Sequence, residues 1–492
     1  MKSLLTRLCA ASLAAVVLSA CMGAKSDASR ERPDPLLLIS IDGFRHDYVS
    51  MFESPNIDRL IEGGLHADSL HQVFPTKTFA THYSIVTGLH PGTHGVVANN
   101  MWDPKRDAGF SLGDRDAVGD GYWYEGGEPI WVTAEKQGLT AATFFWPGSE
   151  ARIRRVRPTH WKPYAGDVPH ATRIDQVLEW TALPERDRPD FMTLYFSVVD
   201  SLGHGHGPAA EPVLAAAERL DRELGRLIDG LEAQGRLDEM HIILVSDHGM
   251  SEIDKSRYIM LNEYLDLGRV RVSDWGPAAQ IWATDMPVGD IVDALDGAHP
   301  KMRVWARDDI PDRYRFGSHH RVPDVLVEAD PGWMISNRAY MAQRQPPRGM
   351  HGWDPAHGEQ HGLFIAHGPA FPAGSRSPAV RSVDLYALMS ELLGLEAAEN
   401  EGTLAPFAPY LGAGDPPAYR VARFDCAGER VEARIGPAHM ALHVGDAIHV
   451  LDRVAEHRYR EADLEFTIED DHAAGVVDGR RLEDCRRLET DA

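Results

Sequence analysis

Continuous apolar runs alternate with amphipathic segments along most of this 492-residue chain. Short apolar runs that stop at polar or glycine residues are typical of buried parallel strands. The runs of this kind are Leu36–Ile41, Ala141–Trp146, Phe191–Val199, Ile242–Ser246, Val325–Glu328 and Leu363–Ala366. Apolar positions at helical spacing predict helices at Pro55–Ile61, from about Thr78, at Ile130–Lys136, around Ile174–Trp180, at Val213–Ala233 and at Val383–Leu393. The alternation predicts an α/β domain over residues 36–415, with a mainly parallel sheet between helices.

The pattern changes from about Ala418 onwards. Shorter runs such as Val421–Phe424, Arg430–Arg434 and Ala447–Leu451 alternate apolar and polar positions. This period favours antiparallel strands with one buried face. We therefore expect a second, small antiparallel β domain over residues 418–490.

The first residues have the composition of a targeting segment. Lys2 and Arg7 precede the apolar run Leu8–Leu18, which is short for a membrane span, and small residues lead into Cys21. This order is typical of a bacterial lipoprotein signal peptide over residues 1–21, cleaved so that Cys21 becomes the acylated N-terminus. The alternative is an ordinary secretory signal. Both interpretations predict an exported protein. The first predicts a periplasmic or outer-membrane-anchored lipoprotein, in which residues 22–35 form a polar tether.

Export changes the interpretation of the cysteines. With Cys21 used for lipidation, Cys426 and Cys485 remain in the mature chain, and an oxidising compartment favours a disulfide between them. The loop that they close would stabilise the fold by about 4 kcal/mol on a chain-entropy argument.

Overall charge narrows the range of partners. The formal net charge is −24, with 25% charged residues. A protein that coats polymeric nucleic acid needs a basic surface, so that class is excluded. A single nucleotide held by metal ions is compatible with the charge.

Thr78 lies where a helix is expected to begin, in the segment Phe74–Asn99. Unpaired N–H groups and the positive end of the helix dipole would stabilise a phosphate beside its hydroxyl. A threonine before a helix is also an ordinary N-cap. Thr78 is therefore a candidate nucleophile that needs support from other residues.

Acidic and histidine residues supply that support at the ends of the predicted strands. The set consists of Asp42, Asp200, His204, Asp247 and His248, with His351 in a loop before the Leu363 strand. Ligands of α/β sheets bind beyond the carboxyl ends of the strands. Carboxylate and imidazole together suit Zn²⁺, and two such ions would clamp the attacking and leaving oxygens of a phosphoryl transfer.

Several motifs resemble the nucleotide pyrophosphatase/phosphodiesterases of the alkaline phosphatase superfamily. They are IDGFR (Ile41–Arg45), FPTKTF (Phe74–Phe79), HYSIVTGLHP (His82–Pro91), FWPGSE (Phe145–Glu150), DSLGHGHGP (Asp200–Pro208), SDHGM (Ser246–Met250) and GMHGW (Gly349–Trp353). The resemblance implies an alkaline phosphatase-like fold and two Zn²⁺ per chain. One ion would be held by Asp200, His204 and His351, and the other by Asp42, Thr78, Asp247 and His248.

The resemblance also implies roles for individual residues. Thr78 would be the nucleophile and would pass through a phospho-threonine ester, while Asn99 would hydrogen-bond a phosphoryl oxygen. Phe79 and Tyr164 match positions that sandwich the base, and Tyr195 lies near the sugar or base. The implied reaction is hydrolysis of nucleotide phosphodiester or pyrophosphate bonds with release of a nucleoside monophosphate.

Other reactions are disfavoured by particular residues. A sulfatase needs a cysteine or serine in a C/S-x-P-x-R setting, which neither mature-chain cysteine has. A phosphomonoesterase brings an arginine to the terminal phosphate, and Arg45, the nearest by motif, is better read as structural. Lys77 is either a contact for a distal phosphate or an ordinary exposed lysine. A non-nucleotide phosphate ester stays open as an alternative substrate.

The C-terminal segment resembles the membrane-bound C-type lysozyme inhibitors, in which a disulfide closes a compact β-barrel. The resemblance covers about Tyr419–Arg487 and implies lysozyme as a partner. The Ser-Gly loop of those inhibitors is missing, and Glu456–Tyr459 stands in its place. A stabilising or partner-binding module is the alternative interpretation.

Overall fold

The structure, a computed structural model, describes residues 32–343, 345–412, 414–469 and 471–488. The chain divides at Pro33 into a short N-terminal unit and the body, Asp34–Ala492. The predicted signal peptide and Cys21 lie outside the described residues. Among those described, no helix has both the length and the apolar character that crossing a membrane requires.

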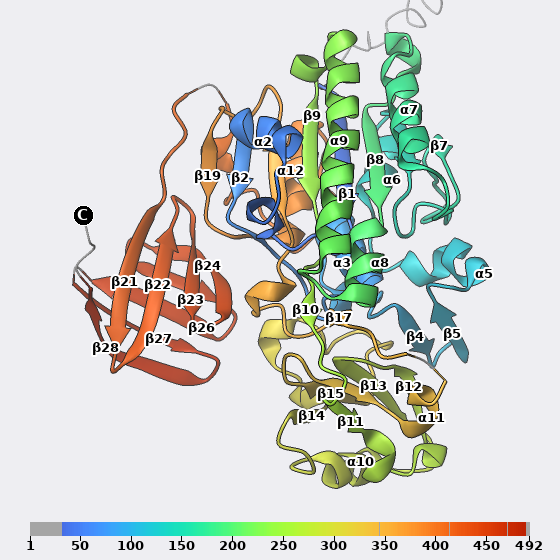
Figure 1. The fold of residues 1–492 in the computed structure, drawn as a ribbon, viewed down its shortest axis with the longest axis vertical. Coiled ribbons are helices and arrows are strands. Elements are labelled where there is room, and N and C mark those ends of the chain that lie inside the picture. Colours follow the sequence, from blue (N-terminus) through green and yellow to red (C-terminus); the bar gives the residue numbers. More distant parts are fainter. Residues whose placement is uncertain (1–31, 344, 413, 470, 489–492) are drawn as a thin grey trace, which may run out of the picture. The chain divides into compact units, whose positions relative to one another are not determined.

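An eight-stranded sheet forms the centre of the body, in the order β19-β2-β18-β9-β1-β8-β6-β7 (Figure 1). Its strands are β1 (Leu36–Ile41), β2 (Gly64–Ala67), β6 (Ala141–Phe144), β7 (His160–Trp161), β8 (Phe191–Phe196), β9 (His241–Val245), β18 (Phe364–His367) and β19 (Ser375–Ser377). β1 pairs in parallel with both β8 and β9, whereas β18 runs antiparallel to β9 and β2. The predicted mainly parallel sheet is confirmed.

Successive residues of the central strands point to opposite faces, and each face has its own core. Leu36 and Leu38 of β1 belong to one apolar cluster, and Leu37 and Ile39 belong to the other. The first cluster includes residues of α3 (Thr78–Thr87), α6 (Ile130–Lys136) and α12 (Leu385–Leu392). The second includes residues of α2 (Pro55–Glu62), α7 (His170–Thr181) and α9 (Glu211–Ala233). Strands buried on both faces explain why their sequences are continuous apolar runs.

Two predicted strands end earlier than their apolar runs. The strand predicted to reach Val199 stops at Phe196, because helix α8 (Val198–His206) begins there and its apolar residues continue the run. The strand predicted to reach Trp146 stops at Phe144. Apolarity alone does not separate a strand end from the buried turn that follows it.

The predicted strand Val325–Glu328 exists as β15 (Val325–Ala329), but its membership of the main sheet was wrong. It lies in a separate four-stranded antiparallel sheet with β12 (Val270–Asp274), β13 (Ala278–Ala283) and β14 (Met302–Ala306). Helix α10 (Val288–Leu295) packs on this sheet, and Ile281, Ile291 and Val327 share one apolar cluster. An apolar run does not specify its pairing partner, so the sequence could not assign this strand to a sheet.

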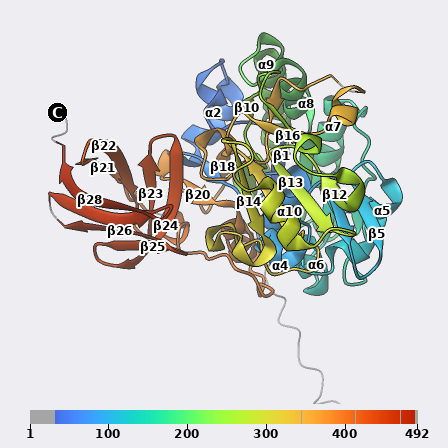
Figure 2. The same ribbon diagram turned by 90° about the horizontal axis from the view of Figure 1, so that it is seen from below.

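Residues from Arg420 onwards form a closed antiparallel barrel of eight strands. These are β21 (Arg420–Cys426), β22 (Glu429–Ile435), β23 (His439–Val444), β24 (Ala447–Ala455), β25 (Arg458–Glu461), β26 (Leu464–Glu469), β27 (His472–Val477) and β28 (Arg480–Arg487) (Figure 2). The first and last strands pair and are joined by the Cys426–Cys485 disulfide. The predicted antiparallel domain is confirmed, and closure leaves it without a free sheet edge.

Candidate active site

Helix α3 carries Thr78 at its first position, so the threonine is not the N-cap. The N-cap is Lys77, whose extended backbone (φ −120°, ψ 141°) makes no side-chain capping bond. The Thr78 side chain is therefore not used to cap its own helix. Its Oγ1 lies 3.4 Å from Nε2 of His248. This places the hydroxyl beside the strand-end residues that the sequence singled out.

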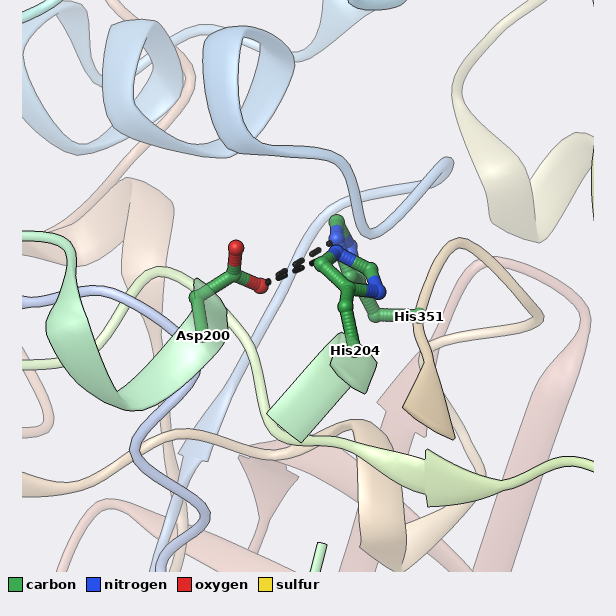
Figure 3. Close-up of side chains that lie close together, drawn as sticks. All are labelled: Asp200, His204 and His351. Atoms are coloured by element: carbon green, nitrogen blue, oxygen red, sulfur yellow. Dashed lines mark ion pairs between the residues drawn. The ribbon is translucent and has the colours of Figure 1, made fainter. Parts of the chain in front are cut away.

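Asp200, His204 and His351 form the first of two carboxylate–imidazole groups. Asp200 and His204 occupy successive turns of α8, and His351 follows β17 (Gly349–Met350). Figure 3 shows both imidazoles directed at the Asp200 carboxylate. Nε2 of His204 lies 3.3 Å from Asp200 Oδ1, and Nε2 of His351 lies 3.6 Å from it.

Asp42, Asp247 and His248 form the second group, at the ends of β1 and β9. His248 Nε2 lies 3.3 Å from Asp42 Oδ1 and 3.1 Å from Asp247 Oδ2. The His248 and His351 rings stack with centroids 3.4 Å apart, so the two groups adjoin. Gly43 (φ +69°) makes this approach possible, since a Cβ there would lie 2.8 Å from Asp200 Cα.

Hydrogen bonds fix the tautomer of each of the three imidazoles. Nδ1–H of His204 donates to Gly349 O (2.8 Å), that of His248 to Gly249 O (2.9 Å), and that of His351 to Thr76 O (2.7 Å). Each Nε2, the nitrogen that remains for a metal ion, then faces a carboxylate oxygen. Backbone partners of this kind are what orients metal-binding histidines.

The carboxylate oxygens are also arranged as ligands of a cation would be. Asp42 Oδ1, Asp200 Oδ1 and Asp247 Oδ2 are buried and accept no hydrogen bond. These are the oxygens that face the three Nε2 atoms. A buried carboxylate oxygen without a hydrogen bond is costly unless a cation, a metal ion or a protonated imidazole, balances its charge. The donor set of oxygen and imidazole nitrogen fits Zn²⁺.

In the protein alone, the buried carboxyl groups of this site lie close enough to shift one another's pKa values. Burial, and then the charges of Asp247 and Asp200, raise the pKa of Asp42 well above its usual value. Burial also opposes ionisation of Asp247, but His248 and His82 outweigh it and hold the pKa of Asp247 well below its usual value. Strongly shifted pKa values cluster at functional sites, in agreement with the interpretation of these residues as metal ligands.

Asn99 is held at the start of helix α3. Its Oδ1 accepts a hydrogen bond from the backbone N–H of Phe79 (2.9 Å). The amide Nδ2 is then the end of the side chain that can donate, as an oxygen-binding role requires.

A cavity of about 250 Å³ opens beside Thr78, and we call it the Phe79 cavity. Phe79, Tyr164 and Tyr195 all line it, so the structure brings the predicted base-binding residues together. Tyr164 is 38% exposed and its ring lies edge-on to Tyr195 at 6.0 Å. The Tyr195 hydroxyl donates to Asp42 Oδ2, a contact that its place in a strand did not reveal.

Arg45 and Lys77 are both engaged by acidic side chains. Arg45 forms a double hydrogen bond with Asp47 (2.6 and 3.0 Å), in agreement with a structural role. Lys77 was considered as an exposed lysine, which is wrong: it is 3% exposed and its Nζ is paired with Asp274. Asp274 ends β12, in a sheet that the sequence did not place near Thr78.

Further lining residues of the Phe79 cavity were not found from the sequence. Arg115 and Glu150 line it and pair with each other, and Trp146 contributes its wall. Trp146 and Glu150 fall inside the FWPGSE motif, which could have indicated them. Arg115 begins the short helix α5 (Arg115–Gly119), and no pattern around it signals a site.

The main sheet is mainly parallel, with one carboxylate–imidazole group at the ends of β1 and β9 and the other group beside it. This is the arrangement expected of an alkaline phosphatase-like fold. The model of the family "Type I phosphodiesterase / nucleotide pyrophosphatase" matches residues 36–354. The chain belongs to that family.

The chain is similar to mouse ectonucleotide pyrophosphatase/phosphodiesterase family member 1, with 39% identity over 385 residues that cover 75% of this chain and 42% of the relative. It is 37% identical to the venom phosphodiesterase of Macrovipera lebetinus over 75% of this chain and 44% of that protein. The matches thus span less than half of these relatives.

One solved structure is matched over its whole chain. Murine ectonucleotide pyrophosphatase/phosphodiesterase 5, as an inactive threonine-to-alanine variant in complex with AMP, superposes with a TM-score of 0.74. The identity is 33%, covering 78% of this chain and all of that chain.

Proposed function

We propose that this protein hydrolyses nucleotide phosphodiester and pyrophosphate bonds through a phospho-threonine intermediate, releasing a nucleoside monophosphate. The observation that carries the proposal is the position of the Thr78 hydroxyl against two adjoining carboxylate–imidazole groups with unpartnered oxygens. Family membership supports hydrolysis of a phosphodiester. The AMP complex of the murine relative supports a nucleotide substrate.

The two groups are the places where two zinc ions would bind. Asp200, His204 and His351 would hold one ion, and Asp42, Asp247 and His248, with Thr78, the other. When bound, zinc supplies positive charge that lowers the pKa of the Thr78 hydroxyl and neutralises the phosphoryl oxygens.

The chain's own residues account for the remaining chemistry. Thr78 Oγ1 forms a bond to phosphorus as the bond to the leaving oxygen breaks, and water then cleaves the phospho-threonine ester. Asn99 Nδ2 donates to a phosphoryl oxygen, and this bond strengthens as negative charge develops. Two in-line displacements give net retention at phosphorus.

The Phe79 cavity receives the nucleoside in this proposal. Phe79 and Tyr164 offer ring faces and edges to a base, and stacking of this kind contributes about 1–3 kcal/mol with little preference among bases. The hydroxyl of Tyr195 is occupied by Asp42, so its ring is what remains to contact the sugar or base.

Activity against two chromogenic esters tests the proposal. We expect the purified, metal-loaded protein to cleave p-nitrophenyl thymidine monophosphate faster than p-nitrophenyl phosphate. Thr78→Ala should lower turnover by at least about a thousandfold, the scale for loss of a nucleophile, with metal content unchanged by elemental analysis. Tyr83→Phe, on the buried side of the same helix, serves as the matched control. A Thr78→Ala protein with near-normal turnover would rule out the mechanism.

A phosphomonoesterase is the second candidate, and Arg115 is the observation in its favour. Its guanidinium lines the Phe79 cavity, where a terminal phosphate would need a cation. The pairing of Arg115 with Glu150 weighs against this role. Faster cleavage of p-nitrophenyl phosphate than of the nucleoside diester would select the monoesterase.

The cellular location of the protein and the role of the barrel are further parts of the proposal. We propose export and anchoring through acylated Cys21 on the basis of the N-terminal sequence pattern alone. For the barrel, disulfide closure of an antiparallel domain is consistent with a lysozyme-inhibitor-like or other binding module. Inhibition of lysozyme by the full-length protein would select the first of these.

A further inference from the structure

Residues 351–361, which we call the His351 loop, connect a candidate metal ligand to the main sheet. Within this loop, η9 (Gly358–Gln360) is a single 3-10 turn, and the other residues belong to no helix or strand. A segment of this kind keeps its shape through contacts with its surroundings. These contacts therefore bear on the candidate metal group to which His351 belongs.

The first residues of the loop are held by the segment that leads to Thr78. Nδ1–H of His351 donates to Thr76 O (2.7 Å), and the Gly352 N–H donates to Thr76 Oγ1 (2.8 Å). The His351 ring is thus fixed from one side. The middle of the loop, from Asp354 to Gly358, has other partners.

The middle of the loop pairs with the backbone of the barrel. The N–H of Ile448 donates to Ala356 O (2.7 Å), and the N–H of Gly358 donates to Asp446 O (3.1 Å). Strand β24 pairs with β25 only from Asp452 onwards. Near its start, β24 therefore has the His351 loop as a backbone partner.

A chain of ionic contacts leads from the barrel to the same part of the loop. Asp478 lies between β27 and β28, and its Oδ1 is 3.3 Å from Nε of Arg313. The Arg313 guanidinium forms a double hydrogen bond with the Asp354 carboxylate, with Nη1 2.8 Å from Oδ1. The same Oδ1 accepts from the Ala356 N–H (2.9 Å), so the position of Asp354 sets the path of the loop.

Low exposure gives these ionic contacts their strength. Asp354 is 4% exposed and the Arg313 side chain 14%, whereas the Asp478 side chain is 31% exposed. Buried charges are screened by salt much less than exposed ones. The link is therefore strong between Arg313 and the loop and weaker between Arg313 and the barrel.

We propose that the barrel is a clamp on the His351 loop, and that Asp478 is a positioning residue that acts through Arg313 and Asp354. The clamp keeps the loop in the geometry in which His351 Nε2 faces Asp200, and so slows the release of a metal ion from that group. The barrel lies outside the residues that the family model matches, 36–354, so this role is not taken from the family. The inference rests on the proposed function for the identity of the ion, whereas the ordering of the loop does not.

Asp478→Asn removes the charge with little change to the backbone. Asp478 has a φ of +50°, in the left-handed region that asparagine adopts readily. Asp484→Asn is the matched control, because Asp484 has a φ of +54°, lies on β28 of the same barrel and is exposed.

Hydrogen exchange of the metal-free protein measures the loop directly. In Asp478→Asn we expect peptides from residues 351–361 to exchange about threefold faster than in the wild type, the scale of a partly exposed ion pair. Asp484→Asn should exchange at the wild-type rate. Unchanged exchange in the loop would overturn the clamp, and so would equally faster exchange along the whole chain, which reports general destabilisation.

Zinc release measures the effect on the metal group. After loading with Zn²⁺ and transfer to a chelator, Asp478→Asn should lose one of two zinc ions about threefold faster than the wild type, and the other at the wild-type rate. Elemental analysis of timed samples gives both rates. Faster loss of both ions, or of neither, would contradict the assignment to the His351 group.

A second variant tests the route through Arg313. Arg313→Gln should speed release of the same ion about tenfold, the lower end of the effect of residues that orient metal ligands. Adding Asp478→Asn to it should change nothing further, because residues that act through one contact are not additive. Multiplied effects would show that Asp478 does not act through Arg313. If Arg313→Gln fails to fold, Asp478→Asn decides by exchange and release.

The two measurements keep the hypotheses apart. A wild-type protein that binds no zinc would refute the metal-dependent reaction under the proposed function. Hydrogen exchange of the loop, which needs no metal, would still decide whether the barrel clamps it.

Discussion

Glu328 on β15 is a carboxyl whose protonation state is coupled to the fold. It is fully buried, and its two oxygens accept from the Asp354 backbone N–H (3.1 Å) and the Tyr314 hydroxyl (2.9 Å). Burial, only partly offset by Arg303, raises its pKa to about 7. The native state therefore holds a proton on Glu328 at pH values where the unfolded chain has lost it.

The sign of the resulting pH dependence follows from linkage. Between about pH 4.5 and pH 7 the native state binds more protons at this site, so its contribution to stability falls as pH rises. Glu328→Gln should remove a decrease on the order of 1–3 kcal/mol between pH 5 and pH 8. Gln keeps an acceptor for Asp354, and Tyr314 can donate instead to the Asp354 carboxylate, 3.1 Å away.

Unfolding by denaturant at both pH values measures this effect. The exposed Glu252→Gln is the matched control and should follow the wild-type pH dependence. An identical slope in wild-type and Glu328→Gln proteins would contradict the assignment.

Strands β24 and β25 of the barrel meet the phosphodiesterase portion through Arg381 of β20 (Val380–Arg381), whose side chain is largely but not fully buried. Its guanidinium binds Asp452 (2.7 and 2.9 Å) and Glu461 (2.6 Å), with 11% of the side chain exposed. Removing one partner of a buried ionic network leaves the other charges uncompensated.

Arg381→Gln should therefore lower stability by about 2–4 kcal/mol, seen as a lower thermal midpoint. The control is Arg186→Gln. The Arg186 side chain is 86% exposed, and its Nε forms an ion pair with Asp187 at 3.2 Å. Loss of this exposed pair should lower stability by less than about 1 kcal/mol. Equal midpoints for the two variants would show that the barrel contact contributes little.

Strand β24 and the turn before it also contact the loop that carries His351. The backbone N–H of Ile448 donates to Ala356 O (2.7 Å), and that of Gly358 donates to Asp446 O (3.1 Å). These bonds lie within ten residues of a candidate metal ligand. The barrel is thus in contact with a loop of the candidate active site, which its separate sequence pattern did not indicate.

At the scale of the whole molecule, the predicted cellular location depends on the signal peptide and Cys21, which lie outside the described residues. Expressed in a bacterial host, the protein should carry an acylated Cys21 at its mature N-terminus and fractionate with membranes. Mass spectrometry of the N-terminal peptide measures this directly, and Cys21→Ala should abolish the modification. A mature wild-type N-terminus at another residue would contradict the lipoprotein prediction.

The sequence by itself determined the local elements and the types of chemistry. β1 and α6 were predicted with their observed bounds, because a buried strand and an amphipathic helix depend on periodicity within a few residues. The candidate ligands were indicated by their places after apolar runs and by family motifs. The barrel was visible as a change of period, although its closure was not.

Only the tertiary structure decided which of these residues meet. The pairing of Lys77 with Asp274, the hydrogen bond from Tyr195 to Asp42, and the assignment of β15 to a second sheet all join segments far apart in the chain. A second cavity beside the candidate metal groups, lined among others by Tyr258, Trp275 and Ser336, is likewise assembled from several elements, and these three residues lie outside the motifs quoted above. Periodicity encodes which face of an element is buried, whereas the partner of that face depends on long-range packing and is not contained in any local pattern.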